Sequence, residues 1–392
     1  MTAAAPPATP APAAAAGRAG WLARVDELLG RPVSMRALAL LRIPVGLIAV
    51  WHLASVLDEV RAAGGRPTFA DPYASWYPAA SPAVESVLLV VGIVAAVALA
   101  AGLATRTAAV VTLAVIVHHL GSSATNVHNN RAFLAIVLAG LAVGPCGREL
   151  SVDAWWRARR GRPALPTEAP AWPLWLLRFE AVSLYGASGL SKLVDPDWFG
   201  GTVTWLRVTG QRADLLASPL PVWAVDALSD RGFHTVAAKV VIGAELFVAL
   251  GLLTRRTRLA AVWVSVAFHV VIQVSASVEV FSYLAIAALV IWATPRTCDR
   301  AVVLDLSSDR QRRLADWVGG LDWLARFRVV AAPPGTRAHV VDRDGTVLTG
   351  APAAVLVLSR LPLTAWPALP LRLVVRPPRP ALVVPSGAGE AS

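Results

Sequence analysis

Long apolar stretches separated by polar, arginine-rich segments dominate this sequence. A helix needs about 20 mostly apolar residues to cross a bilayer. We count eight candidate stretches: 38–56, 83–104, 108–120, 132–143, 172–193, 236–253, 259–275 and 281–293. The third and fourth are short, and helix can continue into their polar flanks. The pattern predicts an all-α polytopic membrane bundle of about eight transmembrane helices.

The composition places the chain among membrane proteins. Of its 392 residues, 56% are hydrophobic and only 16% are charged, and the mean hydropathy is +0.58. These values exclude an ordinary soluble domain. The lipid bilayer is therefore the first expected partner.

The distribution of positive charge predicts the orientation of the chain. The net charge is +11, and arginines gather before the first apolar stretch, at 148–162 and at 255–258. Such a bias is typical of cytoplasmic loops. The basic residues are not interleaved with aromatic residues along one stripe, so no nucleic-acid partner is expected. We expect a multi-pass protein of the cell membrane with both termini in the cytoplasm.

Changes in composition divide the chain into four parts. Residues 1–34 begin with Ala/Pro low complexity and are predicted to be a disordered cytoplasmic tail, 35–297 to be the transmembrane domain, 298–376 to be a small α/β domain, and 377–392 to be a disordered tail. Cys146 and Cys298 provide neither a disulfide framework nor metal-ligand spacing.

Lys192 stands out because lysine is rare here. Among 36 basic residues only Lys192 and Lys239 are lysines. Arginine cannot give up its proton in a protein, whereas a lysine in apolar surroundings can. Lys192 is therefore a candidate proton-transfer group. The alternative is an ordinary interfacial anchor at a helix end.

Ionisable residues inside apolar stretches are costly and are functional candidates. In the fifth stretch Arg178, Tyr185 and Lys192 are spaced seven residues apart, which returns each to nearly the same helix face. Other polar residues within the stretches are Arg42, His52, His118, His119, Glu180, Lys239, Glu245, His269 and Gln273. One polar stripe therefore runs along the fifth helix, and Glu180 lies off it.

A histidine-rich segment follows the third stretch, on the side predicted to face outward with Lys192. Its polar residues are His118, His119, Asn126, His128, Asn129, Asn130 and Arg131. Such a cluster could act as acid and base, hydrogen-bond a ligand, bind a metal, or be a water-exposed polar loop. Because the segment contains no acidic partner, no metal is expected.

The segment between the fifth and sixth stretches is long for a bare loop. Residues 202–208 and 221–228 look amphipathic and could form interfacial helices. These two segments could form a lid or rim over the polar cluster.

Three segments carry a family resemblance. They are YGASGLSKLVDPDWFGGT (185–202), ELFVALGLLTRRTR (245–258) and VAFHVVIQVSASVEVFSYLAIAAL (266–289). In order and spacing they resemble the membrane domain of the vitamin K-dependent γ-glutamyl carboxylase family. The closer likeness is to its bacterial branch, the horizontally transferred transmembrane (HTTM) proteins, over about 35–297.

The resemblance implies a quinol as substrate or cofactor, of the menaquinol or vitamin K type. Lys192 falls on the family's catalytic lysine, which takes a proton from the quinol. The segment HNNRAFL (128–134) looks like the family's Asn-Asn-His segment, but Arg131 stands where the carboxylase has its catalytic histidine. His128 or His118 would have to supply that group. The large lumenal domain of the carboxylases has no counterpart here.

Two hypotheses for the function follow. The first is a membrane enzyme, a quinol-dependent oxygenase, epoxidase or carboxylase-like lyase, with Lys192 as general base toward a lipid-soluble phenol. In it His118 and His128 are catalytic, and the substrate-binding residues are Arg178, Tyr185, His119, Asn129, Asn130, Arg131, Trp198 and His269. The second is a non-catalytic scaffold or a transporter-like protein whose polar stripe carries a solute or holds the bundle together.

The last part of the chain alternates short apolar runs with turns. It predicts strand, helix, strand, a hairpin turning at Asp344 and Gly345, and a helix. This order resembles the DCC family of thioredoxin-like thiol-disulfide oxidoreductases, which carry Asp-Gly-x-Cys-x-x-Cys after the first strand. Here Ser308 and Gln311 occupy both cysteine positions. Because neither forms a thiolate, we expect a redox-inactive domain kept for packing or for a protein partner.

Overall fold

The computed structural model describes residues 13–63, 73–77, 80–254, 256–276, 278, 280–292, 300–322, 326–361, 364–368 and 370–375. The chain divides into two compact units, Met1–Ala293 and Thr294–Ser392. Cys298, the predicted tail 377–392 and the beginning of the N-terminal tail lie outside the described residues.

The first unit is helical, and every predicted apolar stretch overlaps a helix. The principal helices are α2 (Arg36–Ala62), α3 (Pro82–Ala101), α4 (Thr105–Ser122), α5 (Asn129–Val143), α7 (Trp172–Val194), α12 (Arg231–Leu253), α13 (Arg258–Ala276) and α14 (Phe281–Ala288), which continues as the 3-10 turn η2 (Leu289–Trp292). A short helix, α6 (Val152–Arg159), and a 3-10 turn, η1 (Ala124–Asn126), lie in the connections.

Within the described residues, three helices are long and apolar enough to cross a membrane. They are α2, α3 and α12, with mean hydropathies of 1.8, 2.5 and 2.1. Helices α5 and α14 have 15 and 8 residues, which is short for a full span. Helix α7 carries Arg178, Glu180 and Lys192. The eight predicted helices are therefore present, whereas eight spans stay a prediction.

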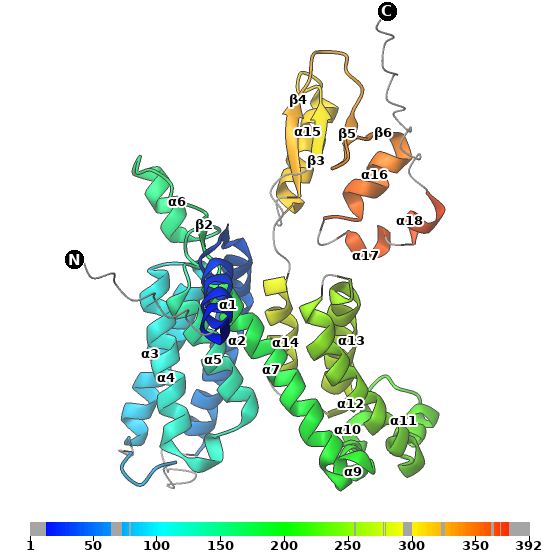
Figure 1. Cartoon of the computed structure of the whole chain (residues 1–392). Coiled ribbons are helices and arrows are strands. Elements are labelled where there is room, and N and C mark those ends of the chain that lie inside the picture. The colour runs from blue at the N-terminus through cyan, green and yellow to red at the C-terminus, as the bar shows by residue number, and fades with distance from the viewer. Residues whose placement is uncertain are drawn as a thin grey trace, which may run out of the picture. The chain divides into compact units, whose positions relative to one another are not determined.

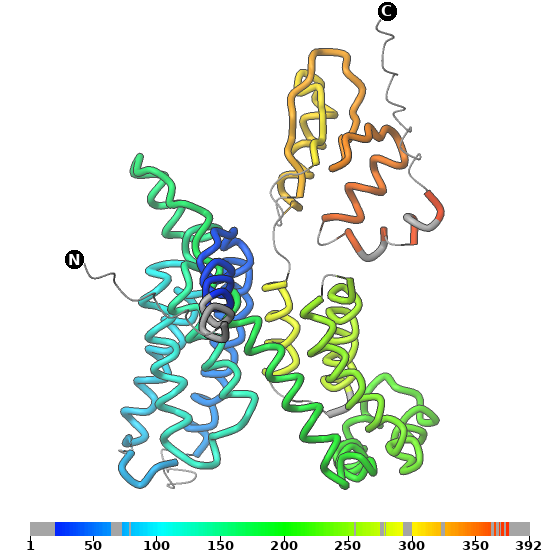
Figure 2. The backbone as a smooth tube through the Cα atoms, in the orientation of Figure 1, coloured from blue at the N-terminus to red at the C-terminus, as the bar shows by residue number. Residues whose placement is uncertain are grey.

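The helices form two groups around one hydrophobic core. Helix α2 packs on α3, α3 on α4 and α4 on α5, while α12 packs on both α7 and α13. Helix α14 contacts α2, α5 and α13 and so joins the groups. Figures 1 and 2 show the long helices of each group running side by side. Buried residues of both groups belong to a single cluster.

The N-terminal segment differs from the predicted disordered tail. Residues Ala13–Gly30 form α1, which contacts α7. Strand β1 (Pro32–Ser34) pairs antiparallel with β2 (Glu168–Pro170), and Val33 lies opposite Ala169. Alanine has the highest helix propensity, so an alanine run read as low complexity can also begin a helix. The β1–β2 pair fastens this segment to the start of α7.

Four short helices connect α7 to α12. They are α8 (Pro196–Phe199), α9 (Thr202–Gly210), α10 (Arg212–Ala217) and α11 (Val222–Ser229). Helices α9 and α11 confirm the two predicted amphipathic segments, and Val208, Leu215 and Val225 form a small core among them. Gly201 has φ +84, and a Cβ there would lie 2.4 Å from the carbonyl oxygen of His234. Only glycine fits this close approach at positive φ.

The second unit is a small sheet with helices. Its elements are β3 (Arg300–Leu304), α15 (Asp309–Leu321), β4 (Phe327–Ala331), β5 (His339–Val341), β6 (Val347–Thr349), α16 (Gly350–Leu358), α17 (Ala365–Ala368) and α18 (Leu371–Val374). The strand order is β4-β3-β5-β6. Strand β3 is parallel to β4 and antiparallel to β5, and β5 and β6 form a hairpin. The predicted succession of elements is confirmed.

Candidate functional site

Lys192 lies in the last turn of α7 and forms an ion pair with Glu245 of α12. Its Nζ is 2.6 Å from Oε1 of Glu245 and 2.7 Å from Oγ of Ser188. Nζ also lies 4.7 Å from the centre of the Trp198 ring, which α8 carries. The side chains of Lys192 and Glu245 are 14% and 5% exposed. The pair is therefore largely removed from solvent.

Close packing of α7 on α12 brings this pair together. Ser188 and Lys192 are one helical turn apart, so they share a face. Between them Gly189 faces α12, where a Cβ would lie 2.9 Å from Leu246. The missing side chain lets the helices approach, and Glu245 then reaches both polar groups of α7. The turn Asp195–Trp198, capped by the Asp195 carboxylate, folds Trp198 back over the amine.

The pair determines how Lys192 could exchange a proton. An ammonium beside a carboxylate is stabilised in its charged form, whereas burial penalises both charges. The carboxylate of Glu245 is the acceptor nearest to the amine. Among the described residues, no polar atom hydrogen-bonds its buried Oε2. The amine of Lys192 and the carboxylate of Glu245 are therefore placed for direct proton transfer along this hydrogen bond.

Tyr185, two turns before Lys192, connects α7 to α13. Its hydroxyl lies 2.7 Å from Nε2 of His269 and 2.8 Å from Oγ of Ser265. His269 is fully buried, and its ring centre is 5.4 Å from that of Phe281. Phe281 in turn contacts Phe133 of α5 at 6.0 Å between ring centres. This row of rings links the Lys192 side of the unit to α5.

Arg178, the third residue of the predicted stripe, has a different environment. Its Nε and Nη2 donate to the carbonyl oxygen of Ile291 at 3.2 and 3.0 Å. Trp175 and Trp292 each lie 5.1 Å from the guanidinium carbon. Arg178 therefore holds η2 against α7, and the three stripe residues contact three different elements.

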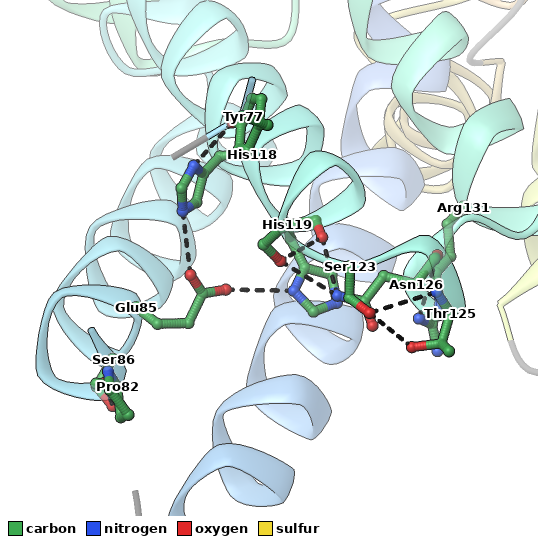
Figure 3. A network of polar contacts seen from close by, with 11 residues as sticks. Tyr77, Pro82, Glu85, Ser86, His118, His119, Ser123, Thr125, Asn126 and Arg131 are labelled. Atoms are coloured by element: carbon green, nitrogen blue, oxygen red, sulfur yellow. Dashed lines mark hydrogen bonds and ion pairs between the residues drawn. The ribbon is translucent and has the colours of Figure 1, made fainter. Parts of the chain in front are cut away.

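A second polar cluster joins α3, α4 and the loop before α3 (Figure 3). Glu85 accepts hydrogen bonds from Nε2 of His118 at 3.1 Å and Nδ1 of His119 at 3.3 Å. The Tyr77 hydroxyl lies 2.9 Å from Nδ1 of His118. The ring of His52 on α2 lies 6.2 Å from that of His119. We call Tyr77, Glu85, His118 and His119 the histidine cluster.

The acidic member of this cluster was not expected from the sequence. The histidine-rich segment itself contains no carboxylate, but Glu85 in the first turn of α3 reaches both rings. Burial, and then the charge of Glu85, raise the pKa of Tyr77. Within the described residues, no group of three or more His, Cys, Asp or Glu side chains is arranged to hold a metal ion.

The remaining predicted residues lie around the start of α5. His128 is exposed and caps this helix, because its Nδ1 accepts from the backbone N–H of Asn130 at 3.3 Å. Asn129 is exposed, whereas Asn130 is buried. Nη1 of Arg131 donates to the carbonyl oxygen of Asn126 at 3.4 Å. The His128 ring therefore accepts a hydrogen bond from the backbone, whereas the rings of His118 and His119 hydrogen-bond the carboxylate of Glu85. Figure 1 shows the α4–α5 connection and the end of α7 at the same end of the unit.

The apolar pattern marks Glu245 as an acid within a stretch without indicating its role, and it does not single out Ser188, Ser265 or Glu85. For Ser188 the available signal was its four-residue spacing from Lys192, which places a hydroxyl beside the amine. For the other three, contact depends on how the helices pack. No local pattern in one helix reports that packing.

Comparison with known proteins supports one assignment. The HTTM domain matches residues 30–296, which includes the whole of both polar clusters. No curated protein and no solved structure matches the chain. Because the match covers more than half of the sequence, this chain belongs to the HTTM domain family.

Proposed function

We propose that the helical unit binds a lipid-soluble phenol of the quinol class and takes a proton from it with Lys192. The observation that carries this proposal is the largely buried pair of Lys192 and Glu245 beneath Trp198. Membership of a carboxylase-like membrane family favours it further. An aromatic ring beside the amine suits a flat aromatic ligand.

The proton transfer can be written in two steps. The ammonium proton of Lys192 first moves along the 2.6 Å bond to Glu245, which leaves a neutral amine and a neutral carboxylic acid. The amine then takes the hydroxyl proton of the quinol. The O–H bond breaks, an N–H bond forms, and the quinolate is left opposite a new ammonium. Burial favours the neutral pair that the first step needs.

The test uses Lys192→Arg, which keeps the charge but removes the base. The purified full chain in detergent is mixed with menadiol in air, and loss of the quinol is followed spectroscopically, because a quinolate reacts with oxygen faster than the quinol. Lys239→Arg is the matched control, since Lys239 is the other lysine and its Nζ bonds the carbonyl oxygen of Thr235. We expect the acceleration of quinol loss to be at least about tenfold smaller with Lys192→Arg than with the native chain, because the variant lacks the general base.

Two results would contradict the proposal. One is equal acceleration by the native chain and Lys192→Arg. The other is loss of acceleration in Lys239→Arg, which would point to the overall fold. A mass-spectrometric survey of copurifying lipids checks binding separately, and we expect a quinone-class compound in the native protein and in both variants.

A non-catalytic scaffold is the second candidate. The observation that favours it is that buried arginine side chains hydrogen-bond backbone carbonyl oxygens of neighbouring segments. Arg42 is fully buried and donates to the carbonyl oxygens of Leu99, Ala100 and Leu150, and Arg178 donates to that of Ile291. In this case neither quinol acceleration nor quinone copurification is expected.

We infer an eight-span arrangement in the cell membrane with both termini in the cytoplasm. Helices at all eight stretches support it, and so does the β1–β2 pair. The four helices α2 to α5 lie between these strands in sequence, and paired strands must be on one side of the bilayer. The number of crossings between them must therefore be even. Accessibility of single cysteines to a membrane-impermeant reagent in whole cells tests this orientation.

For the second unit we infer a thioredoxin-like, DCC-related domain without redox activity. The order β4-β3-β5-β6 with β3 parallel to β4 supports it. Gln311, at the second cysteine position, accepts from the N–H of Asp305 and donates to the carbonyl oxygen of Thr336. This side chain ties the end of β3 to the loop between β4 and β5, as a packing role requires. Thiol-disulfide exchange by a Cys298→Ser chain would contradict the inference.

A further inference from the structure

A pocket of about 710 Å³ opens at the opposite end of the helical unit from Lys192. It lies where α4 begins at Thr105, α5 ends at Val143 and α7 begins at Trp172, and α6 covers part of it. In the eight-span arrangement proposed above, these helix ends place the pocket at the level of a bilayer interface. Neither the histidine cluster nor the Lys192–Glu245 pair contributes to it.

Arginine dominates the charged lining of this pocket. The five arginines are Arg106, Arg148, Arg157, Arg160 and Arg162, and the one lining carboxylate is Asp153. Both oxygens of Asp153 are engaged by the start of α4: Oδ1 accepts from the N–H of Ala104, and Oδ2 from the N–H and hydroxyl of Thr105. The carboxylate is therefore a helix cap, and the lining keeps a strong positive charge.

The side chains of these arginines have few ion-pair partners among the residues that the structure describes. Among the described residues, none of the five lies within ion-pair distance of a carboxylate. Arg148 uses Nη1 to hold the carbonyl oxygens of Pro166 and Glu168, and Arg160 lies over the ring of Trp156. Arg157 is half-buried and faces the pocket from α6. Gathering like charges around a hollow is unfavourable unless an anion enters it.

The lining also has an apolar part. Val143, Leu165, Trp172 and Pro173 face the same space. Guanidinium groups suit phosphate because their N–H fork matches its oxygens in a bidentate geometry. Apolar side chains and tryptophan beside such groups suit a ligand that joins a phosphate to carbon chains.

We propose that this pocket binds a phosphate group of a phosphate ester, with Arg157 as a principal ligand. The ester can be the headgroup of an anionic phospholipid or a soluble molecule, and the two sources share the chemistry that the arginines recognise. The site is independent of the proposed proton transfer at Lys192.

The test measures binding of radiolabelled phosphatidylglycerol to the delipidated full chain in detergent, with phosphatidylcholine as the zwitterionic comparison. We expect saturable binding that prefers phosphatidylglycerol. Arg157→Gln should weaken it about tenfold, which corresponds to ~1.4 kcal/mol. Arg157→Lys should recover only part of the loss, because it keeps the charge without the fork.

Arg159→Gln is the matched control. It removes the same charge from the same helix, but Arg159 does not line the pocket and lies over Trp155 instead. Its affinity should stay within about twofold of the native chain, because a screened surface charge contributes little. An equal loss in both variants would overturn the proposal in favour of diffuse attraction, and so would equal binding of the two lipids.

Glycerol 3-phosphate distinguishes the two sources. If it displaces the lipid and alone raises the melting temperature of the native chain but not of Arg157→Gln, the ligand is a soluble phosphate ester. If only phosphatidylglycerol binds, the ligand is a lipid headgroup. If neither compound binds saturably, the proposal is wrong.

Discussion

Lys192 and Glu245 form an ion pair between α7 and α12, with Nζ of the lysine 2.6 Å from Oε1 of the glutamate. The family resemblance points to a lone basic amine, whereas the described residues show Lys192 hydrogen-bonded to the carboxylate of Glu245. Any account of Lys192 must therefore include its partner. The stability of the unit depends on both residues together, because a change in either one leaves the other charge without compensation.

The first prediction concerns this coupling. Lys192→Met or Glu245→Gln alone should destabilise the unit by roughly 3 kcal/mol, since each leaves one largely buried group unpaired. The double variant should cost clearly less than the sum of the single changes. Unfolding of the full chain in detergent measures all three. Additive losses would mean that the two side chains do not interact.

The second prediction concerns the hydroxyl of Tyr185. Tyr185→Phe removes the partner of two buried groups, His269 and Ser265, and should cost about 1–3 kcal/mol in the free energy of unfolding. Tyr283→Phe is the control, because Tyr283 is exposed and contacts Trp51 through its ring. Similar melting temperatures for the two variants would show that the buried hydroxyl contributes nothing.

The third prediction concerns Arg42 at the other end of the unit. Its guanidinium binds the last carbonyl groups of α3, and a Cβ at Gly102 would lie 2.2 Å from its Nη1. Arg42→Met should cost roughly 3 kcal/mol, because three carbonyl oxygens lose their donor. The exposed Arg61→Met should change stability by less than ~0.5 kcal/mol. Unfolding of the full chain compares them, and equal costs would contradict the role of Arg42.

The fourth prediction concerns pH and the second unit. The hydroxyl of Ser307, with the N–H groups of Gly335 and Ser307, holds the pKa of Asp305 below its usual value. The native state therefore binds this proton less readily than the unfolded chain. The stabilising contribution is present above the unfolded pKa and is lost as pH falls through the folded pKa.

Asp305→Asn should remove this acid-sensitive part of the stability of the second unit. Denaturant unfolding of the full chain is carried out between pH 2 and 7, and proteolysis at sites within residues 300–361 reports unfolding of the second unit. The denaturant midpoints then give the stability of this unit at each pH. Asp309→Asn is the control, because the Asp309 side chain is exposed and pairs with Arg312. An unchanged acid dependence in Asp305→Asn would show that another group is responsible.

The sequence predicted the eight principal helices of the first unit because each one contains a continuous apolar run. The amphipathic helix α15 begins and ends where its pattern does, and α9 and α11 were expected from theirs. Helix α1 was missed because an alanine-rich run suits both a helix and a disordered tail. The number of spans could not be decided, because α5 and α14 are short and α7 carries charges that can be buried against protein.

For each contact in the two polar sites, the sequence predicted the residues on one helix but not their partners on the neighbouring helix. The seven-residue spacing placed Arg178, Tyr185 and Lys192 on one face of α7, but their partners lie on η2, α13 and α12. In the same way, His118 and His119 were named without Glu85. Partners across helices depend on the rotation and depth of packing, which the pattern of a single helix does not encode.

The pairing of β1 with β2 has a consequence for synthesis of the chain. Strand β2 emerges from the ribosome only after α2, α3, α4 and α5 have been made. Until then the backbone groups of Pro32–Ser34 lack their partners, so this ribbon closes late. A nascent chain that stops before Glu168 contains α2 to α5 but lacks the strand that pairs with β1. The β1–β2 ladder can thus form only after the segment that directly precedes α7 has been synthesised.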